Sequence, residues 1–231
     1  MRAQPIGTRT AAGLVPPGTF AAEQYQNLRL QVERLQQTRG VRVVAVTSPG
    51  TSEGKTLTSI NLAAALARGP AARVLLIDAD MRRPAVVSQL GLGDDGGPGL
   101  AAALSDGAAG GLSQISRDVD GVHGLAVVPT GTAAYDVHEL LRSARFERLL
   151  HEARGEYDFV VLDTPPLVPV CDAAVVSRLV DGLLVVVAAH ETTRKQLGEA
   201  LSLLDEAKTL GLVFNGDTPA RSRKYDAYYR N

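Results

Sequence analysis

Residues 43–56, VVAVTSPGTSEGKT, decide the fold of this 231-residue chain. A short β-branched run leads into a glycine-containing loop that ends in Gly-Lys-Thr, and an apolar pattern with helical spacing follows. A strand, a loop and a helix N-terminus in this order predict a phosphate-binding site, because loop amides and the helix dipole attract phosphate oxygens. Pro49 stands where the first glycine of such a loop is usual, so the alternative is a Gly/Ser turn with a chance Lys-Thr pair.

The lysine and threonine of this loop carry the expected chemistry. We expect Lys55 to reach the β- and γ-phosphates of ATP and the Thr56 hydroxyl to bind Mg²⁺. The residues expected to contact the nucleotide from the loop are Gly50, Thr51, Ser52, Glu53, Gly54, Lys55, Thr56 and Leu57.

Composition narrows the class of protein. Hydrophobic residues make up 45% and charged residues 21% of the chain, which is ordinary for a globular domain with a sizeable core. The net charge of -1 gives no basic field for nucleic acid. The single cysteine, Cys171, excludes an internal disulfide framework and fits a reducing compartment. No run has the length of a signal peptide core or a membrane span, so we expect a soluble, cytoplasmic chain.

Buried strands alternate with helices along the chain. Apolar runs predict strands at 41–47, 73–78, 125–128, 159–163, 182–188 and 212–214. Helices are expected at 19–37, 56–68, 86–90, 100–104, 136–153 and 192–207. This alternation predicts a doubly wound, mainly parallel α/β sheet. It forms one domain over residues 19–216, between an irregular arm (1–18) and a mobile tail (217–231).

Aspartates end two of the predicted strands, at Asp78 and Asp163, and Asp80 lies two residues beyond the first. A lone aspartate after a strand is more often a turn former. Since ligands of parallel sheets bind beyond the carboxyl ends of the strands, we expect Asp78 and Asp163 to converge on the Mg-nucleotide. Two carboxylates beside one metal allow one to orient the metal while the other accepts a proton from an attacking hydroxyl. Arg82 and Arg83 follow, and fit phosphate neutralisation and surface charge equally well.

Three motifs in this order resemble the bacterial tyrosine kinases of capsular and exopolysaccharide synthesis (the CpsD/CapB type and the cytoplasmic domain of Wzc-type proteins). Gly-Lys-Thr at 54–56 matches the Walker A motif, VLLIDADMR at 74–82 the Walker A′ motif and VVLDTPP at 160–166 the Walker B motif. The resemblance spans roughly residues 20 to 216 and implies a P-loop NTPase fold of the MinD/ParA-like branch. MinD-like ATPases carry a further lysine five positions before the loop lysine, where this chain has Gly50. That difference favours the kinase branch.

The resemblance also implies roles for individual residues. Lys55 and Thr56 would hold ATP and Mg²⁺, and Asp78 would be the base for the tyrosine hydroxyl. Asp80 and Asp163 would support the metal site, and Asn215 would lie near the adenine.

Both ends of the domain resemble parts of the family that act between subunits. Glu23 and Arg29 match its Glu-x-x-Arg-x-x-Arg oligomerisation motif, whereas the middle arginine is Gln26, so a ring of subunits would be weakened. The tail contains Tyr225, Tyr228 and Tyr229, where the family has its autophosphorylated tyrosines.

The leading hypothesis is an ATP- and Mg²⁺-dependent protein-tyrosine autokinase that regulates polysaccharide synthesis and export. A transmembrane polysaccharide co-polymerase (chain-length regulator) would activate it and hold it at the inner membrane, and a cognate tyrosine phosphatase would reverse it. The alternatives are a non-kinase switch ATPase and a catalytically weak nucleotide-binding scaffold. The chain would be a separate protein or a domain excised from a longer one.

Overall fold

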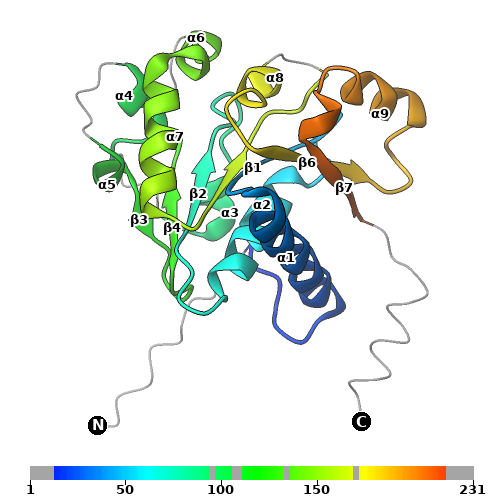
Figure 1. Cartoon of the computed structure of the whole chain (residues 1–231), viewed down its shortest axis with the longest axis horizontal. Coiled ribbons are helices and arrows are strands. Elements are labelled where there is room, and N and C mark those ends of the chain that lie inside the picture. Colours follow the sequence, from blue (N-terminus) through cyan, green and yellow to red (C-terminus); the bar gives the residue numbers. More distant parts are fainter. Residues whose placement is uncertain (1–12, 94–96, 106–110, 133–135, 169–171, 217–231) are drawn as a thin grey trace.

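A seven-stranded sheet forms the centre of the molecule in the computed structural model, which describes residues 13–93, 97–105, 111–132, 136–168 and 172–216 (Figure 1). The strand order is β3-β4-β2-β5-β1-β6-β7. Adjacent strands are parallel except β3 and β4, which pair antiparallel. The strands are β1 (Val43–Thr47), β2 (Val74–Asp78), β3 (Arg117–Asp118), β4 (Leu125–Val128), β5 (Phe159–Asp163), β6 (Gly182–Ala188) and β7 (Thr209–Asn215). The predicted doubly wound, mainly parallel α/β fold is confirmed.

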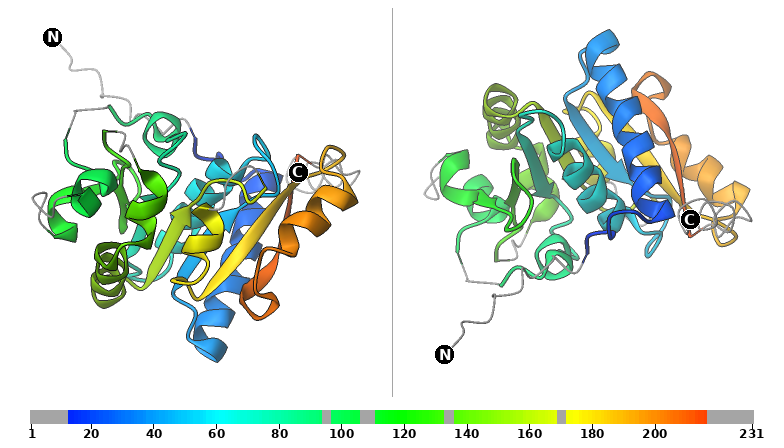
Figure 2. Two further views of the ribbon diagram at one scale, coloured as in Figure 1. Left: turned by 90° about the horizontal axis from the view of Figure 1, so that it is seen from above. Right: turned by 90° about the horizontal axis from the view of Figure 1, so that it is seen from below.

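Helices cover both faces of this sheet (Figures 1 and 2). One apolar cluster joins the sheet to the first three helices, and another joins it to the helices from α4 to α8. Because both faces are covered, every residue of β1, β2, β4 and β5 is buried, as expected for parallel strands. The helices are α1 (Phe20–Arg39), α2 (Lys55–Ala67), α3 (Val86–Leu90), α4 (Leu100–Ser105), α5 (Leu112–Ile115), α6 (Val137–Arg142), α7 (Ala144–Glu156), α8 (Asp172–Val176) and α9 (Arg194–Leu201).

Local capping sets the bounds of α1. The Thr19 side chain accepts a hydrogen bond from the Ala22 amide and begins the helix, as predicted. Gly40, with a φ of 70°, ends it two residues beyond the expected Gln37. Residues 1–12 of the predicted arm and the whole predicted tail lie outside the described residues.

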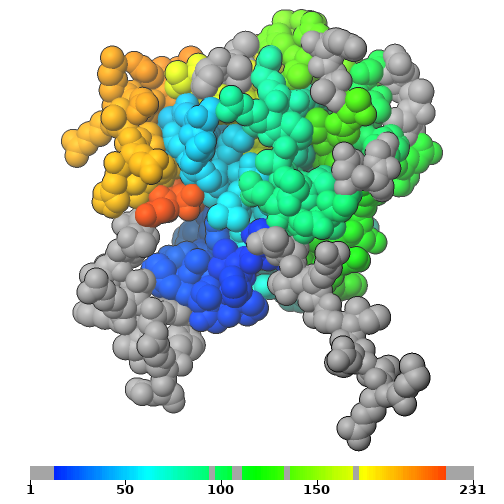
Figure 3. All heavy atoms as spheres, turned by 180° about the vertical axis from the view of Figure 1, so that it is seen from behind, coloured from blue at the N-terminus to red at the C-terminus, as the bar shows by residue number. Residues whose placement is uncertain are grey.

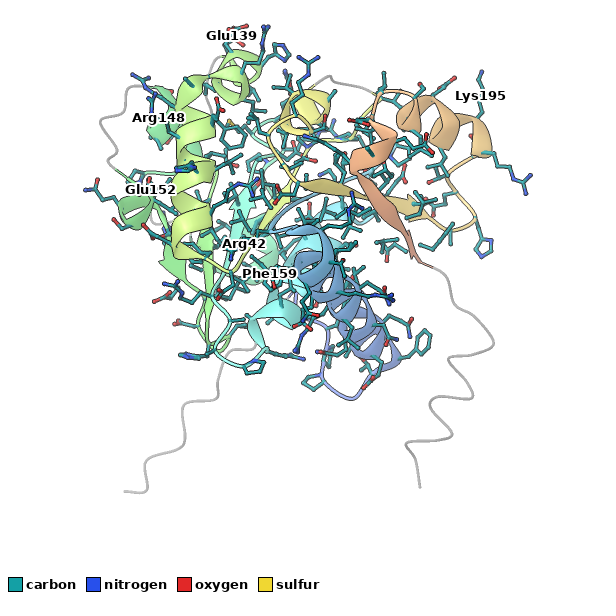
Figure 4. All side chains as sticks on the ribbon, in the orientation of Figure 1. Arg42, Glu139, Arg148, Glu152, Phe159 and Lys195 are labelled. Atoms are coloured by element: carbon teal, nitrogen blue, oxygen red, sulfur yellow. The ribbon has the colours of Figure 1, made fainter. Side chains whose placement is uncertain are left out.

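Two predicted helices are shorter than the apolar pattern indicated. Residues 136–153 form two helices, because Ser143 has an extended ψ of 147° and its side chain caps α7 through the Phe146 amide. The segment 192–207 holds only α9, which begins with a capping box between Thr193 and Gln196, followed by a 3₁₀ turn at Glu206–Lys208. The short elements α5, α8 and β3 were not predicted. The Glu152 carboxylate of α7, labelled in Figure 4, accepts a hydrogen bond from the Leu112 amide at the start of α5.

None of the helices within the described ranges is both long enough and apolar enough to cross a bilayer.

Hydrogen bonds to the Asp181 carboxylate hold together the amino end of the sheet. Asp181 accepts hydrogen bonds at 2.8 Å from the amides of Arg42 (labelled in Figure 4) and Val43, at the start of β1. Both terminal nitrogens of the Arg154 guanidinium also donate to it at 2.8 Å. Partial burial raises the pKa of Asp181, but the hydrogen bonds from Arg154 and the two amides outweigh burial, so the net shift is downward.

Asp181→Ala should lower the free energy of unfolding by about 2 kcal/mol, since it removes charge-assisted bonds and leaves two strand amides unpaired. Because the pKa of Asp181 is lowered on folding, its contribution is present at neutral pH and is lost as the pH falls below the ordinary aspartate range. Urea unfolding at pH 7 and at low pH measures both effects. Asp120→Ala, at an exposed carboxylate, is the matched control; an equal loss in the two variants would contradict the prediction.

Candidate active site

The phosphate loop runs from the end of β1 to the first residue of α2, at the carboxyl edge of the sheet. Seen from behind in Figure 3, it (light blue) lies between the β6–α9 segment (orange) and the chain that follows β2 (blue-green). Two loop residues have left-handed backbone: Ser52, with a φ of 63°, and Gly54, with a φ of 87°. A Cβ atom at Gly54 would also overlap the Asn215 side-chain amide, so position 54 requires glycine.

The Glu53 side chain holds the loop in shape. Its Oε1 atom accepts a hydrogen bond from the Gly50 amide at 2.7 Å. Its Oε2 atom accepts from the Thr192 hydroxyl at 2.8 Å and from the Ala188 amide at 3.2 Å, at the end of β6. The Asn215 side chain donates to the Glu53 carbonyl oxygen at 3.0 Å. Glu53 was predicted only as one of the loop residues; its carboxylate links the loop to the end of β6, and its carbonyl oxygen links it to the end of β7.

The chain after β5 holds Pro49 and its neighbour Ser48 through hydrogen bonds to their carbonyl oxygens. The Leu167 amide donates to the Ser48 carbonyl oxygen at 2.8 Å, and the Val168 amide donates to the Pro49 carbonyl oxygen at 3.2 Å. Pro49 is buried, and a residue without an N–H group can occupy this position because only its carbonyl oxygen bonds.

Three carboxylates lie close to the loop lysine, at and just beyond the ends of β2 and β5. Asp78 and Asp163 are direct partners in the register of β2 and β5. The Lys55 ammonium lies 2.7 Å from Asp80 Oδ2. The Ser59 hydroxyl of α2 donates to Asp163 Oδ1 at 3.2 Å, and sequence analysis did not identify Ser59. The structure therefore brings Lys55, Asp78, Asp80 and Asp163 together.

The carboxylates retain unused acceptors. Asp78 Oδ2 accepts hydrogen bonds from the Ala85 and Val86 amides at 3.1 and 3.0 Å. Asp78 Oδ1 and Asp163 Oδ2 are buried and accept none from the residues that the structure describes. Burial, reinforced by the charge of Asp163, raises the pKa of Asp78 to about 7. Burial also raises the pKa of Asp163 to about 6, against the opposing charge of Lys55.

This donor set fits Mg²⁺ bound together with phosphate. Within the described ranges, no group of three His, Cys, Asp or Glu side chains is arranged to hold a metal alone. Mg²⁺ is usually held by one or two carboxylates, water and substrate phosphates, so a full protein cage is not required. Asp163 Oδ2, which accepts no hydrogen bond from the described residues, is a suitable ligand, and Thr56 at the start of α2 is near enough to Asp163 for its hydroxyl to lower the pKa of that carboxyl.

Arg82 bonds to protein rather than standing in solvent as an isolated surface charge. Its Nε atom donates to Asp172 Oδ2 at 2.6 Å, and His138 Nδ1 lies 3.2 Å from Asp172 Oδ1. The fully buried Asp172 of α8 thus joins the chain after β2 to α6. Sequence analysis gave no functional role to Asp172 or His138.

The remaining predicted residues lie away from this centre. Arg29 donates to the Glu33 carboxylate of its own helix at 2.7 Å and to Gln26 Oε1 at 3.4 Å. Glu23 lies in the first turn of α1. The three tail tyrosines, Tyr225, Tyr228 and Tyr229, and Cys171 are outside the described residues.

Asp78→Asn should stabilise the metal-free protein increasingly as the pH rises from 5 to 8. The unfolded carboxyl loses its proton near pH 4, whereas the folded one keeps it to about pH 7, so wild-type stability falls as the pH rises across this interval. Thermal unfolding in EDTA gives the difference in Tm at each pH. Asp120→Asn, which alters an exposed carboxylate, is the control substitution. A pH-independent effect of Asp78→Asn would contradict the prediction.

Comparisons with known proteins identify relatives over almost the whole chain. A family model described as an AAA domain matches residues 41–209. The chain is 31% identical over 222 residues to the tyrosine-protein kinase YwqD of Bacillus subtilis. This alignment covers 95% of this chain and 91% of that protein. It is 33% identical over 206 residues to the putative tyrosine-protein kinase EpsB of Ralstonia nicotianae, of whose length it spans only 26%.

Solved structures of tyrosine kinase domains also resemble this chain. The BceF tyrosine kinase domain superposes with a TM-score of 0.75 at 32% identity, over 85% of this chain and 77% of that one. A ParA family ATPase from Chlorobium tepidum, at 19% identity and a TM-score of 0.59 over 80% of this chain and 81% of that one, shows the shared P-loop fold alone. The Walker-type motifs, their convergence at the sheet edge and these similarities show that the chain belongs to the bacterial tyrosine-protein kinase family.

Proposed function

We propose that this chain is an ATP- and Mg²⁺-dependent protein-tyrosine autokinase that phosphorylates Tyr225, Tyr228 and Tyr229 of its C-terminal tail. The observation that carries the proposal is the convergence at one sheet edge of a phosphate loop, its lysine and a buried aspartate, one of whose oxygens accepts no hydrogen bond from the described residues. Phosphoryl transfer needs little beyond positioning and charge stabilisation, and these groups supply both.

Each residue has a distinct part in this reaction. The amides at the start of α2 and the Lys55 ammonium bind phosphate oxygens, so the nucleotide competes with Asp80 for Lys55. Asp78 takes the proton of the tyrosine hydroxyl, whose ordinary pKa of about 10 makes a base useful at neutral pH. Thr56, Asp80 and Asp163 would hold Mg²⁺, and the ion would supply positive charge to neutralise the phosphates. Asn215, bonded to the loop at Glu53, would also contact the adenine.

The names of two relatives suggest the biological process in which this chain acts. Curated relatives include the tyrosine-protein kinase CpsD of Streptococcus pneumoniae and the succinoglycan biosynthesis transport protein ExoP of Rhizobium meliloti. We infer that the chain regulates synthesis and export of a surface polysaccharide from the cytoplasmic side of the inner membrane. A transmembrane co-polymerase activates it there, and a cognate phosphatase reverses the modification.

Incubation with labelled ATP, Mg²⁺ and an activator fragment should place phosphate on the tail tyrosines, and mass spectrometry locates it. Lys55→Met should reduce the phosphotyrosine signal on the order of 100-fold or more, because it removes a positive charge that stabilises the transition state. The variant with all three tail tyrosines changed to phenylalanine should bind ATP normally and incorporate no label in the tail.

The outcomes separate the alternatives. Phosphate release without phosphotyrosine selects a switch ATPase. Tight ATP binding without turnover, even with the activator, selects a scaffold. Either result overturns the proposed kinase.

Self-assembly through α1 is the second part of the proposal. Arg29 is the surviving arginine of the oligomerisation motif, and it is bound to Glu33 and Gln26 of its own helix. To contact a neighbouring subunit it must leave Glu33, so the internal pair competes with the ring.

Glu33→Gln should therefore strengthen self-association roughly tenfold, since it weakens a charge-assisted bond of about 1.5 kcal/mol that holds Arg29. Sedimentation velocity over a concentration series measures the change. Glu147→Gln, at an exposed position of α7, controls for the altered net charge. Unchanged or weaker association of Glu33→Gln would count against an interface made by Arg29.

A further inference from the structure

Asp172 is a buried carboxylate to which the proposed reaction gives no part. It is fully buried at the start of α8, and one guanidinium bonds both of its oxygens. Arg82 Nε donates to Oδ2 at 2.6 Å and Arg82 Nη2 donates to Oδ1 at 3.5 Å. His138 Nδ1 of α6 lies 3.2 Å from Oδ1. Since both oxygens are engaged by protein, this carboxylate is suited to holding Arg82 in one orientation rather than to binding a ligand.

Arg82 belongs to the tight turn that carries Asp80. The Arg83 amide donates to the Asp80 carbonyl oxygen at 3.0 Å and closes a turn that contains Arg82. The same amide donates to Asp80 Oδ1 at 3.2 Å, and Lys55 pairs with Asp80 Oδ2 at 2.7 Å. The turn therefore sets the position of the Asp80 carboxylate, and a displacement of Arg82 would be passed on to it.

Asp172 belongs to the chain that follows β5, the strand that ends in Asp163. This chain also contacts the phosphate loop, because the Leu167 amide donates to the Ser48 carbonyl oxygen at 2.8 Å. The ion pair of Asp172 with Arg82 thus joins the segments that follow two neighbouring strands, β2 and β5. Each of these strands leads into one of the carboxylates expected to bind the metal.

We propose that Asp172 is a positioning residue for the Mg²⁺ site. Through Arg82 it clamps the turn that carries Asp80 against the chain after β5, and so keeps the Asp80 and Asp163 carboxylates in place for the ion. The inference rests on the proposed function, which gives both carboxylates to Mg²⁺. A group that orients a metal ligand matters here because Mg²⁺ demands near-ideal octahedral geometry. Asp172 itself contacts neither the ion nor the nucleotide.

Asp172→Asn tests the assignment because it keeps the size of the side chain and removes the charge that holds Arg82. The Mg²⁺ concentration for half-maximal binding of a fluorescent ATP analogue should rise about tenfold, as is usual when a group that orients a metal ligand is lost. The affinity for the analogue in EDTA should stay within about twofold of the parent, since Lys55 and the loop amides are unchanged.

Asp136→Asn is the matched control. Asp136 is exposed and caps α6, the helix that carries His138, by accepting a hydrogen bond from the Glu139 amide. Asparagine caps helices as well as aspartate does, so this variant should shift neither the Mg²⁺ response nor the affinity in EDTA.

Hydrogen exchange in EDTA detects the clamp without metal or nucleotide. The Arg83 amide is bonded to Asp80, so the segment 79–86 of Asp172→Asn should exchange about fivefold faster than in the parent. Asp136→Asn should leave this segment unchanged. A lower thermal stability of Asp172→Asn, with an unchanged Mg²⁺ response and unchanged exchange of this segment, would show a purely structural ion pair and overturn the inference.

A second variant guards against a folding defect in the first. Arg82→Gln alters the exposed partner, whose side chain is 47% exposed, and should shift the Mg²⁺ response by a similar factor. The double variant should show no larger shift than either single one, because both act through one pair. Additive shifts, or no shift for Arg82→Gln, would overturn the clamp. A parent protein that binds Mg-nucleotide but forms no phosphotyrosine would instead overturn the proposed kinase function.

Discussion

Asp78 and Asp163 end neighbouring strands in register, and this places two carboxylates side by side in a buried edge of the sheet. Burial is the main reason why the pKa of each is raised, and the charge of Asp163 raises the pKa of Asp78 further. The other charges of the site respond to this constraint. Lys55 pairs with Asp80, Ser59 donates to Asp163, and two amides at the start of α3 donate to Asp78. A cation brought by the nucleotide would complete the same compensation.

The phosphate loop depends on side chains that lie outside its motif. Glu53 binds the Gly50 amide and the end of β6, and Asn215 binds the Glu53 carbonyl oxygen from the end of β7. The chain after β5 holds Ser48 and Pro49 through their carbonyl oxygens. The loop is therefore fixed by β5, β6 and β7 together, which explains how it accommodates a proline in place of the usual first glycine.

The row of groups along the sheet edge connects the fold to the reaction. A parallel sheet brings its carboxyl ends to one edge, so the strand order β1, β5, β2 sets the order of the phosphate loop, Asp163 and Asp78 along that edge. Helices pack on both faces of the sheet, and the buried Asp172 joins the chain after β2 to α6 through Arg82 and His138.

The sequence by itself determined the sheet, its six main strands, the phosphate loop and the strand-end aspartates, because burial pattern and loop chemistry are local properties. It did not reveal the break at Ser143, because apolar spacing continues across it, nor the early end of α9. Only the tertiary structure decided that Glu53 braces the loop and that Arg29 is bound by Glu33. The Glu53 contacts join residues far apart in the chain, and the Arg29 pair is one choice among several partners within reach. Their arrangement is set by packing rather than by any pattern along the sequence.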